Sequence, residues 1–550
     1  MAELAELFTA GELLAAEKIA RLYGERDPLV LSALAMTIKV LESGSVCLDL
    51  ELAAQQLQAL AEEQLPDYAW PGTAEWLAAL TASPMVETGT GFNRPLHLVG
   101  TRLYLQRYYE QEQRVQRRFA ELAAQSWPVP GLDAILDAVF GANADPYQRQ
   151  AAATAAQRGL TIVAGGPGTG KTYTIAKIIS TLQQVAAAAP VAGWPAQPRI
   201  ALAAPTGKAA TRITESLLES GAAALSGVTI HRLLGYQPGK RTRFAHDGFD
   251  PLPYDVVIVD EASMVPLLLM DRLLAALPPG CRLVLVGDPD QLAPVLAGAV
   301  LSDITTVASG TPSLVRLRQN HRFSGAISDC AAAVLAGDPE ALLAAIDGEQ
   351  VRLVTDSPAA AITQLVLPAA EALIESAHAA PVADTLARQR SLQLLCAHRI
   401  GPAGAEHWNA EIIRALRSAG LAGDDARWFA GMPLLYGHNS ADLGLSNGDT
   451  GVVYASPQGL VAHFGPGDGV PVQLLEDTTP SYAITVHKAQ GSQFQHVILL
   501  LPGVDSPLLT RELLYTALTR AQSQVTIIGS IDSLTKAVNS PALRVSGFSA

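Results

Sequence analysis

One glycine-rich stretch restricts the fold of this 550-residue chain more than any other feature. Gly165 to Thr172 fits the pattern G-x-x-x-x-G-K-S/T of a phosphate-binding P-loop. The apolar run Leu160 to Ala164 predicts a buried strand before it, and Tyr173 to Gln184 has a helical pattern after it. In that context backbone N–H groups surround phosphate oxygens, and the helix N-terminus adds the positive end of its dipole. The stretch therefore predicts an α/β domain that binds a nucleoside triphosphate.

The same pattern predicts which residues bind the cofactors, ATP and Mg²⁺. Lys171 should reach the β- and γ-phosphates, and Thr172 should ligate Mg²⁺. The predicted nucleotide-binding residues are Gly165, Gly166, Pro167, Gly168, Thr169, Gly170, Lys171 and Thr172. Upstream, Gln148 begins a predicted helix, and its amide can accept from and donate to the edge of adenine at once. A solvated glutamine at a helix start fits that position equally well.

Polar residues follow the next buried strands in the chain. The strands are predicted at Ile200–Ala204, Asp255–Val259 and Arg282–Val286, and the alternation with helices favours a parallel, doubly wound sheet. Ligands bind at the carboxyl ends of such strands. There, Asp260 is predicted to hold Mg²⁺ and Glu261 to orient and deprotonate the attacking water. Gln291, at the end of the third strand, can sense the γ-phosphate.

The remainder of the chain predicts further domains. Residues 1–125 have a mostly helical pattern, and residues 132–313 contain the P-loop unit. A second α/β unit is predicted over 314–550, interrupted at 428–482 by short strands and many glycines that indicate an inserted β-barrel. The predicted fold class is therefore α/β with two P-loop-type units. Since Arg322 and Arg520 lie in polar clusters beside apolar strands of the second unit, they could reach a γ-phosphate bound between the units.

Composition narrows the cellular setting. No stretch of about 18 apolar residues predicts a membrane span, and the acidic N-terminus lacks the features of a signal peptide. The four cysteines show no metal-ligand spacing and favour a reducing, cytoplasmic location. A net charge of −14 argues against a general nucleic-acid coat but leaves room for a narrow basic channel. The basic run Lys240 to Arg243 fits either a solvated loop or a nucleic-acid contact.

Taken in order, these motifs resemble those of superfamily 1B DNA helicases. They are Gly165 to Thr172, Ala204 to Ala210, Val259 to Met264, Val286 to Val295, Gln319 to Arg322, Asn447 to Val452, Val486 to Gln493 and Tyr515 to Arg520. The match is closest to the RecD family, the alpha subunits of exodeoxyribonuclease V (RecBCD). Leu103 to Glu110 also looks like the end of the N-terminal domain in that family.

The resemblance implies ATP-driven translocation on single-stranded DNA in the 5′-to-3′ direction. It implies that Gln148 reads adenine, that Gln291 couples the site to the rest of the motor, and that Arg322 and Arg520 are arginine fingers. The residues that match motifs lining the DNA path are Pro205, Thr206, His231, Thr485, His487 and Lys488. In the terms of the family, 132–313 is RecA-like domain 1A with a 1B insertion at about 229–252. Residues 314–550 are RecA-like domain 2A, and 428–482 is the SH3-like domain 2B.

The resemblance also implies partners. In RecBCD the N-terminal domain docks on the RecC-type subunit, the nuclease centre lies in the RecB-type subunit, and the complex acts in double-strand break repair and recombination. The DNA substrate would be the 5′ strand of an unwinding duplex end, and exonuclease activity would belong to the complex.

Two alternatives stay open at this point. One is a stand-alone superfamily 1B helicase of the RecD-like or Pif type, which an N-terminal docking domain would disfavour. The other is a P-loop ATPase that acts as a switch or scaffold without translocation, which would not need a second α/β unit carrying arginines.

Overall fold

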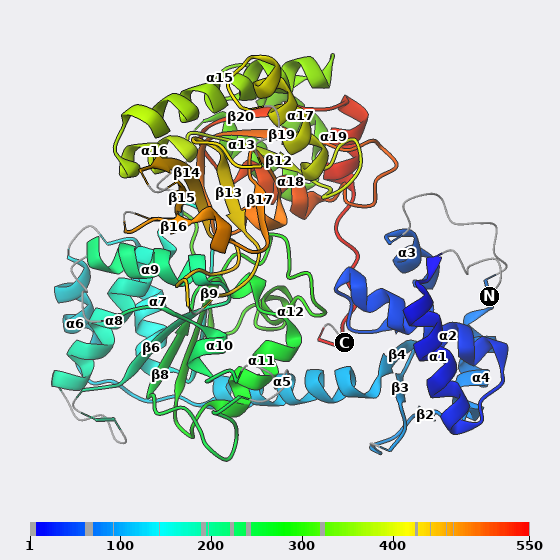
Figure 1. Cartoon of the computed structure of the whole chain (residues 1–550). Helices are drawn as coiled ribbons and strands as arrows, with labels where there is room; N and C mark the ends of the chain where they lie inside the picture. Colours follow the sequence, from blue (N-terminus) through cyan, green and yellow to red (C-terminus); the bar gives the residue numbers. More distant parts are fainter. Residues whose placement is uncertain are drawn as a thin grey trace.

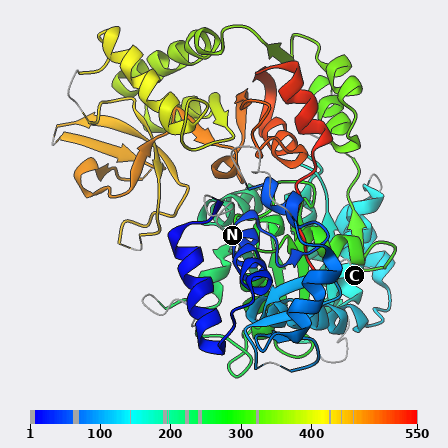
Figure 2. The ribbon, with the colours of Figure 1, turned by 90° about the vertical axis from the view of Figure 1, so that its right-hand side faces the viewer.

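The computed structural model describes residues 7–60, 70–91, 93–141, 144–188, 194–195, 197–219, 225–237, 244–319, 325–423, 427–440, 442–457, 459–465 and 467–548. An N-terminal domain adjoins two α/β units, each with its own parallel sheet (Figure 1). The second unit lies above the first together with a separate antiparallel sheet (Figure 2). The predicted α/β class with two parallel-sheet units is therefore confirmed.

The N-terminal domain combines helices with a small sheet. Its helices are α1 (Ala10–Tyr23), α2 (Pro28–Val40), η2 (Leu41–Ser43, a 3-10 helix), α3 (Ala53–Gln58) and α4 (Thr73–Ala82). The strands β1 (Leu48–Asp49), β2 (Val86–Glu87), β3 (Leu96–Val99) and β4 (Arg102–Leu105) form a sheet in the order β1-β4-β3-β2. Leu34, Trp76 and Leu103 are buried between the helices and the sheet. The stretch predicted as mostly helical thus also contains a sheet.

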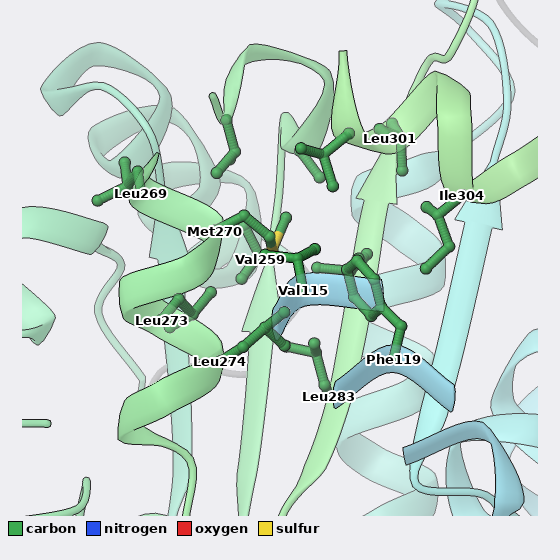
Figure 3. Packing of buried hydrophobic residues seen from close by; sticks show 14 of the residues in the cluster. Val115, Phe119, Val259, Leu269, Met270, Leu273, Leu274, Leu283, Leu301 and Ile304 are labelled. Atoms are coloured by element: carbon green, nitrogen blue, oxygen red, sulfur yellow. The ribbon is translucent and has the colours of Figure 1, made fainter. Parts of the chain in front are cut away.

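A 19-residue helix, α5 (Gln106–Ala124), joins this domain to the first α/β unit. The apolar residues that meet in this contact include Val115, Phe119, Met270, Leu273 and Leu274 (Figure 3). Arg114 of α5 also donates two hydrogen bonds, of 2.9 and 2.8 Å, to the two carboxylate oxygens of the buried Asp271. This paired, charge-assisted contact fixes the helix on the first unit.

The first α/β unit is built on six parallel strands in the order β10-β5-β9-β8-β6-β7. The strands are β5 (Leu160–Ala164), β6 (Ile200–Ala204), β7 (Val228–Thr229), β8 (Val256–Val259), β9 (Arg282–Gly287) and β10 (Leu314–Arg316). The helices are α6 (Leu132–Phe140), α7 (Pro146–Gln157), α8 (Lys171–Ala188), α9 (Gly207–Glu219), α10 (Ile230–Leu233), η3 (Ala262–Met264), α11 (Leu267–Ala276) and α12 (Val300–Val307). Strands β5, β6, β8 and β9 are buried throughout, as helices on both faces of a parallel sheet require.

The predicted boundary between the two units, at residue 314, is wrong. Strand β10 pairs in parallel with β5 and so belongs to the first sheet. The N–H of Leu317 continues this pairing with a 2.8 Å bond to the carbonyl of Ala164. A short apolar run fits the edge of either sheet, and only the tertiary pairing decides between them.

The second α/β unit has five parallel strands in the order β11-β20-β19-β12-β18. The strands are β11 (Val351–Val354), β12 (Leu392–Cys396), β18 (Ala483–Thr485), β19 (Phe494–Leu500) and β20 (Ala521–Ile528). The helices are α13 (Ala326–Ala336), α14 (Pro339–Ala345), α15 (Pro358–Ala379), α16 (Val382–Gln389), α17 (Ala405–Ser418), η5 (His487–Ala489), α18 (Arg511–Leu518) and α19 (Ile531–Asn539).

An antiparallel sheet interrupts this unit. Its strands are β13 (Pro433–Tyr436), β14 (Thr450–Ser456), β15 (Gly459–His463), β16 (Val470–Pro471) and β17 (Thr478–Pro480), with η4 at Val472–Leu474. The order is β16-β15-β14-β13-β17, and all five strands lie within residues 428–482. Since β16 and β17 form the two edges of the described sheet, closure into an SH3-like barrel stays a prediction.

Helix α15 is long and apolar enough to cross a membrane by length and composition. It carries Pro368 in its interior, and its residues Ile362, Val366 and Ile374 are buried in the core shared by the second unit and the antiparallel sheet. Packing inside the protein therefore accounts for its apolar side.

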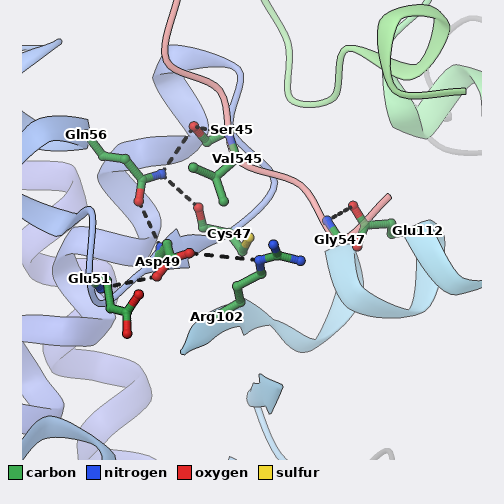
Figure 4. Close-up of polar contacts among 9 residues, drawn as sticks. All are labelled: Ser45, Cys47, Asp49, Glu51, Gln56, Arg102, Glu112, Val545 and Gly547. Atoms are coloured by element: carbon green, nitrogen blue, oxygen red, sulfur yellow. Dashed lines mark hydrogen bonds and ion pairs between the residues drawn. The ribbon is translucent and has the colours of Figure 1, made fainter. Parts of the chain in front are cut away.

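Residues 540–548, which we call the C-terminal tail, return from the second unit to the N-terminal domain and α5 (Figures 1 and 4). The carbonyl of Val545 accepts a 2.8 Å bond from the N–H of Val46. The N–H of Gly547 donates to Oε1 of Glu112 on α5, at 2.9 Å. The tail thus ties the end of the second unit to the side of the molecule that carries the N-terminal domain.

The Glu112 carboxyl is fully buried where the tail crosses α5. A Cβ at Gly547 would clash with it and lie 2.6 Å from Oη of Tyr104, so the backbone approaches closely only because residue 547 is glycine. Burial raises the pKa of Glu112 to about 7.

Replacing Glu112 with Gln should change how stability depends on pH. The folded protein keeps this proton while the unfolded chain loses it between about pH 4.5 and 7, so the carboxyl destabilises the native state progressively across that window, by up to about 3 kcal/mol. Glutamine does not titrate. The unfolding temperature of Glu112→Gln relative to the unchanged protein should therefore rise between about pH 5 and pH 8.

The matched control is Glu121→Gln, on the same helix, where the side chain is 50% exposed. It should show no such trend. If the difference for Glu112→Gln stays constant with pH, the raised pKa is contradicted.

Candidate functional site

The P-loop leaves the carboxyl end of β5 and leads into α8. The N–H of Gly165 donates to the carbonyl of Gly287 on β9, at 3.0 Å, so the loop starts beside that strand. Gly168 and Gly170 have φ angles of 84° and 78°, in the left-handed region that favours glycine. Turns of this kind let a backbone curve around an anion.

Lys171 is the first residue of α8. Its ammonium group donates to the carbonyls of Gly165 and Gly166, at 2.8 and 3.0 Å. The charge therefore lies inside the curve of the loop, at the positive end of the helix dipole, where phosphate oxygens can meet both.

The acidic pair follows β8, two strands from the P-loop strand in the first sheet. Asp260 is buried, and its Oδ1 accepts a 2.9 Å bond from the N–H of Glu261. Burial, and then the Glu261 charge, raise the pKa of Asp260 to about 6, which leaves it ionised at neutral pH. Glu261 has a φ of 50°, a strained value for a residue with a side chain. Such strain is typical of residues held in place by a functional site.

Gln291 lies beyond the end of β9, where the sequence predicts a γ-phosphate sensor. Its Nε2 donates to Oδ2 of the fully buried Asp288, at 2.9 Å. The sequence prediction gave no role to Asp288, although this residue directly follows the apolar strand β9, as Asp260 follows β8.

A cavity of about 560 Å³ between the two α/β units brings most of the predicted site together. The predicted residues that line it are Pro167, Gly168, Gly170, Lys171, Thr172, Asp260, Glu261, Gln291 and Arg520. Arg520 comes from the second unit and is only 2% exposed. Its guanidinium donates to the carbonyls of Thr516 and Ser492, at 3.2 and 3.4 Å, so its position follows α18.

Arg212 also lines this cavity, and the sequence reading missed it. It lies on α9 and donates to the carbonyl of Gly491 in the second unit, at 3.3 Å. No local pattern indicates this role, because the contact with Gly491 is made by the other unit.

Gln148 does not line the cavity. Its amide is buried and donates to the carbonyl of Thr169 in the P-loop, at 3.4 Å. Arg322, the other predicted arginine finger, lies outside the described residues.

The predicted DNA-path residues fall into two groups. Thr485, His487 and Lys488 line a groove of about 740 Å³. Residues from every part of the molecule complete this groove, including Glu42 and Leu60 (N-terminal domain), Val295 (first unit), Pro480 (antiparallel sheet) and Leu543 (tail). The groove is therefore a junction of all parts of the chain.

The other group lies on the first unit. Thr206 caps α9, its Oγ1 accepting a 3.3 Å bond from the N–H of Ala209. Pro205 precedes it. His231 is exposed, and its ring lies near the rings of Tyr236 and Phe244, with centroids 5.9 and 6.0 Å away. The basic run Lys240 to Arg243 lies outside the described residues.

Three known family models match separate parts of the chain. Residues 148–297 match an AAA domain family, residues 480–528 match the UvrD-like helicase C-terminal domain, and residues 5–104 match the N-terminal domain of RecBCD enzyme subunit RecD.

Individual relatives add to these matches. The RecBCD enzyme subunit RecD of Mycolicibacterium smegmatis is 42% identical, over 99% of this chain and 97% of its own length. The ATP-dependent RecD2 DNA helicase of Deinococcus radiodurans is 34% identical, over 68% of this chain but only 47% of its own length. Among solved structures, Bacteroides Pif1 bound to single-stranded DNA is 16% identical, with a TM-score of 0.41 over 70% of this chain and 91% of its own.

A cavity that is lined by a P-loop and shared by two parallel-sheet units, together with the family matches over both units, places the chain among the P-loop helicases. Within that class the near full-length identity is decisive. The chain belongs to the RecD family.

Changing Glu261 to Gln tests the acidic pair. The amide keeps the shape of the side chain but cannot accept a proton from water. We expect ATP binding to be retained and hydrolysis to fall at least ~10²-fold, measured by nucleotide titration and steady-state turnover. Glu340→Gln, at the exposed start of α14, is the control and should turn over normally. Normal turnover by Glu261→Gln itself would show that another group activates the water.

Proposed function

We propose that this chain is a motor that uses ATP hydrolysis to move 5′-to-3′ along single-stranded DNA, as the RecD-type subunit of a RecBCD-type helicase–nuclease. The observation that carries the proposal is the cavity between the two α/β units, with the P-loop on one wall and Arg520 on the other. A site shared in this way closes around the nucleotide and opens after hydrolysis. Each turnover therefore moves one unit relative to the other.

The proposed roles follow from what each side chain can contact. Lys171 neutralises the β- and γ-phosphates, Glu261 activates the attacking water, and Gln291 senses the γ-phosphate. Arg520 stabilises charge in the transition state, with Arg322 as the second arginine finger and Gln148 as the adenine reader.

We assign Mg²⁺ to Thr172 and Asp260. Both line the same cavity, and a hydroxyl and an ionised carboxylate are the oxygen ligands that Mg²⁺ prefers. Asp260 suits a cation because burial leaves its charge poorly solvated and already raises its pKa. When bound, the ion would supply positive charge beside the phosphates.

The groove lined by Thr485, His487 and Lys488 is the proposed path for one part of the DNA strand. It contains apolar as well as basic side chains, which suits stacked bases and phosphates without sequence preference. Pro205, Thr206 and His231 would extend the path along the first unit. A Cβ at Gly207 would clash with Ser446, so this stretch lies next to the antiparallel sheet. That contact supports the proposal that the sheet acts as the SH3-like domain 2B and helps to grip the strand.

The proposed partners are RecB- and RecC-type subunits, with the nuclease centre in the former. A docking face on the N-terminal domain fits α1, where Leu14 and Leu22 are 49% and 83% exposed. These two leucines would give a partner apolar side chains to pack against. The four cysteines are free and buried, which supports a reducing, cytoplasmic location.

Two observations weigh against the alternatives. The chain covers 97% of a RecBCD-subunit relative but only 47% of the RecD2 helicase, so a complex subunit is favoured over a stand-alone enzyme. A switch or scaffold without translocation gives no reason for an arginine of a second unit to line the nucleotide cavity.

Arg520→Ala should slow hydrolysis on the order of 10³-fold, while ATP affinity changes much less, because the arginine acts on transition-state charge. Arg520→Lys keeps the charge without the two-pronged geometry and should recover only part of the rate. Equal losses in rate and affinity would indicate a binding role instead. Unfolding temperatures of both variants must match the parent, since the side chain is buried.

The assembly and the polarity are tested together. Leu14→Asp/Leu22→Asp should abolish co-purification with RecB- and RecC-type subunits at an unchanged unfolding temperature. Leu474→Asp, at a position 58% exposed on η4, is the control and should co-purify normally. Point changes are preferable to deleting residues 1–125, because that deletion removes α5 from the core of the first unit. Strand displacement from 5′ and 3′ overhangs, with Lys171→Ala as the inactive control, then gives the direction. Unwinding from 3′ overhangs would contradict the proposed polarity.

A further inference from the structure

Asp288 is a fully buried carboxylate for which the proposed chemistry has no role. Its Oδ1 accepts from the N–H of Asp290 at 3.1 Å. Its Oδ2 accepts two side-chain donors, Nε2 of Gln291 at 2.9 Å and Oη of Tyr515 at 3.0 Å. Burial raises its pKa, and the nearby charge of Lys171 opposes that rise. Asp288 therefore connects the predicted γ-phosphate sensor with a tyrosine of the other unit.

Tyr515 reaches this carboxylate from α18 of the second unit. Its ring is only 4% exposed. A Cβ at Gly166 would lie 2.9 Å from its hydroxyl oxygen, so the hydroxyl rests against the P-loop as well as on Asp288. Tyr515 is thus the point at which α18, the helix that leads to Arg520, contacts the nucleotide loop of the first unit.

Two further bonds hold the same region of the first unit to the second. The N–H of Leu292 donates to Oγ1 of Thr516, at 2.8 Å, and the carbonyl of Leu292 accepts from Nε2 of Gln490, at 2.7 Å. The residue that follows Gln291 is therefore fixed to α18, the helix that carries Tyr515. Movement of α18 and movement of this loop cannot be independent.

The shared oxygen of Asp288 has a consequence for Gln291. In this scheme the Gln291 amide turns from Asp288 toward the γ-phosphate. A buried carboxylate oxygen that loses its last side-chain donor is strongly disfavoured. With the Tyr515 hydroxyl in place, Oδ2 keeps a donor when Gln291 departs. Without that hydroxyl, departure would leave Oδ2 with none, and Gln291 would be held on Asp288.

We propose that Tyr515 is a positioning residue for ATP hydrolysis, which acts through Asp288 to free Gln291 for the γ-phosphate and to keep α18 aligned with the P-loop. The inference deepens the proposed function and rests on it. Tyr515 does not touch the reacting atoms in this scheme. Tyr515 changes the fraction of time that Gln291 contacts the γ-phosphate. It therefore affects the turnover rate rather than the affinity for ATP.

Tyr515→Phe removes only the hydroxyl and tests the proposal in the full chain with a single-stranded oligonucleotide. We expect kcat for DNA-stimulated ATP hydrolysis to fall by about 10-fold, with the Kd for a non-hydrolysable ATP analogue changed by less than about 3-fold. Tyr104→Phe is the matched control. That tyrosine is also buried, and it lies on β4 of the N-terminal domain, away from the nucleotide cavity and the DNA groove. It should leave both constants unchanged.

A double-mutant cycle separates action through Gln291 from a purely structural role. If Tyr515 acts by freeing Gln291, then Tyr515→Phe should lower kcat by less than about 2-fold in a Gln291→Ala background. The positioning role would be overturned if the double variant lost kcat by the product of the two single losses. Equal losses of kcat and ATP affinity in Tyr515→Phe would also overturn it. Hydrolysis equal to the parent in Tyr515→Phe would also overturn it. Failure of the proposed function is distinct, because the unchanged chain would then show no DNA-stimulated hydrolysis at all.

Discussion

Charge buried between the two α/β units is the constraint on which the site depends. Asp260, Asp288 and Arg520 are 8%, 0% and 2% exposed. Single charges buried to this extent are strongly destabilising unless opposite charges and hydrogen-bond donors surround them. Here Lys171 opposes the rise in pKa of both carboxyls, and Glu261 and Asp288 oppose the fall in pKa of the Arg520 guanidinium. Lys171 belongs to the same unit as these carboxyls, whereas Arg520 comes from the second unit, so its buried charge depends on the acids of the first. The P-loop cavity and the interface between the units therefore depend on the same buried charges.

The sequence predicted the parts of this site that depend on local chemistry. A P-loop between a strand and a helix, and an acidic pair after an apolar strand, are short patterns whose backbone context can be read directly from neighbouring residues. The sequence did not predict roles for Asp288 and Arg212, because each makes its key contact with the other unit. Asp288 accepts a hydrogen bond from Tyr515, and Arg212 donates one to Gly491. The same limit explains the error at β10. Its apolar residues fit an edge strand of either sheet, and only pairing with β5 places it in the first.

Contacts distant in sequence also shape the N-terminal domain. The sequence predicted its helices. Nothing in residues 1–125 indicates, however, that α5 packs into the core of the first unit or that the tail returns to Val46. No sequence motif marks Gly547. A glycine is needed there because Glu112 and Tyr104 lie too close for a Cβ atom. The N-terminal domain is thus attached both to the first unit, through α5, and to the second unit, through the tail.

The tail and the nucleotide site meet on one helix. At the start of α18, the N–H and Nε of Arg511 donate to the carbonyls of Ser540 and Val538, each at 2.9 Å, and Glu512 accepts from the N–H of Ala542. Further along the same helix, Tyr515 reaches Asp288 and the P-loop. Contiguous contacts alone do not establish coupling, which requires an element that both sites displace. Helix α18 meets the structural condition, because its middle contacts Asp288 and the P-loop through Tyr515 while the tail holds its start. Any displacement of the N-terminal domain that moves the tail at Val545 would therefore reach α18, the helix that leads to Arg520.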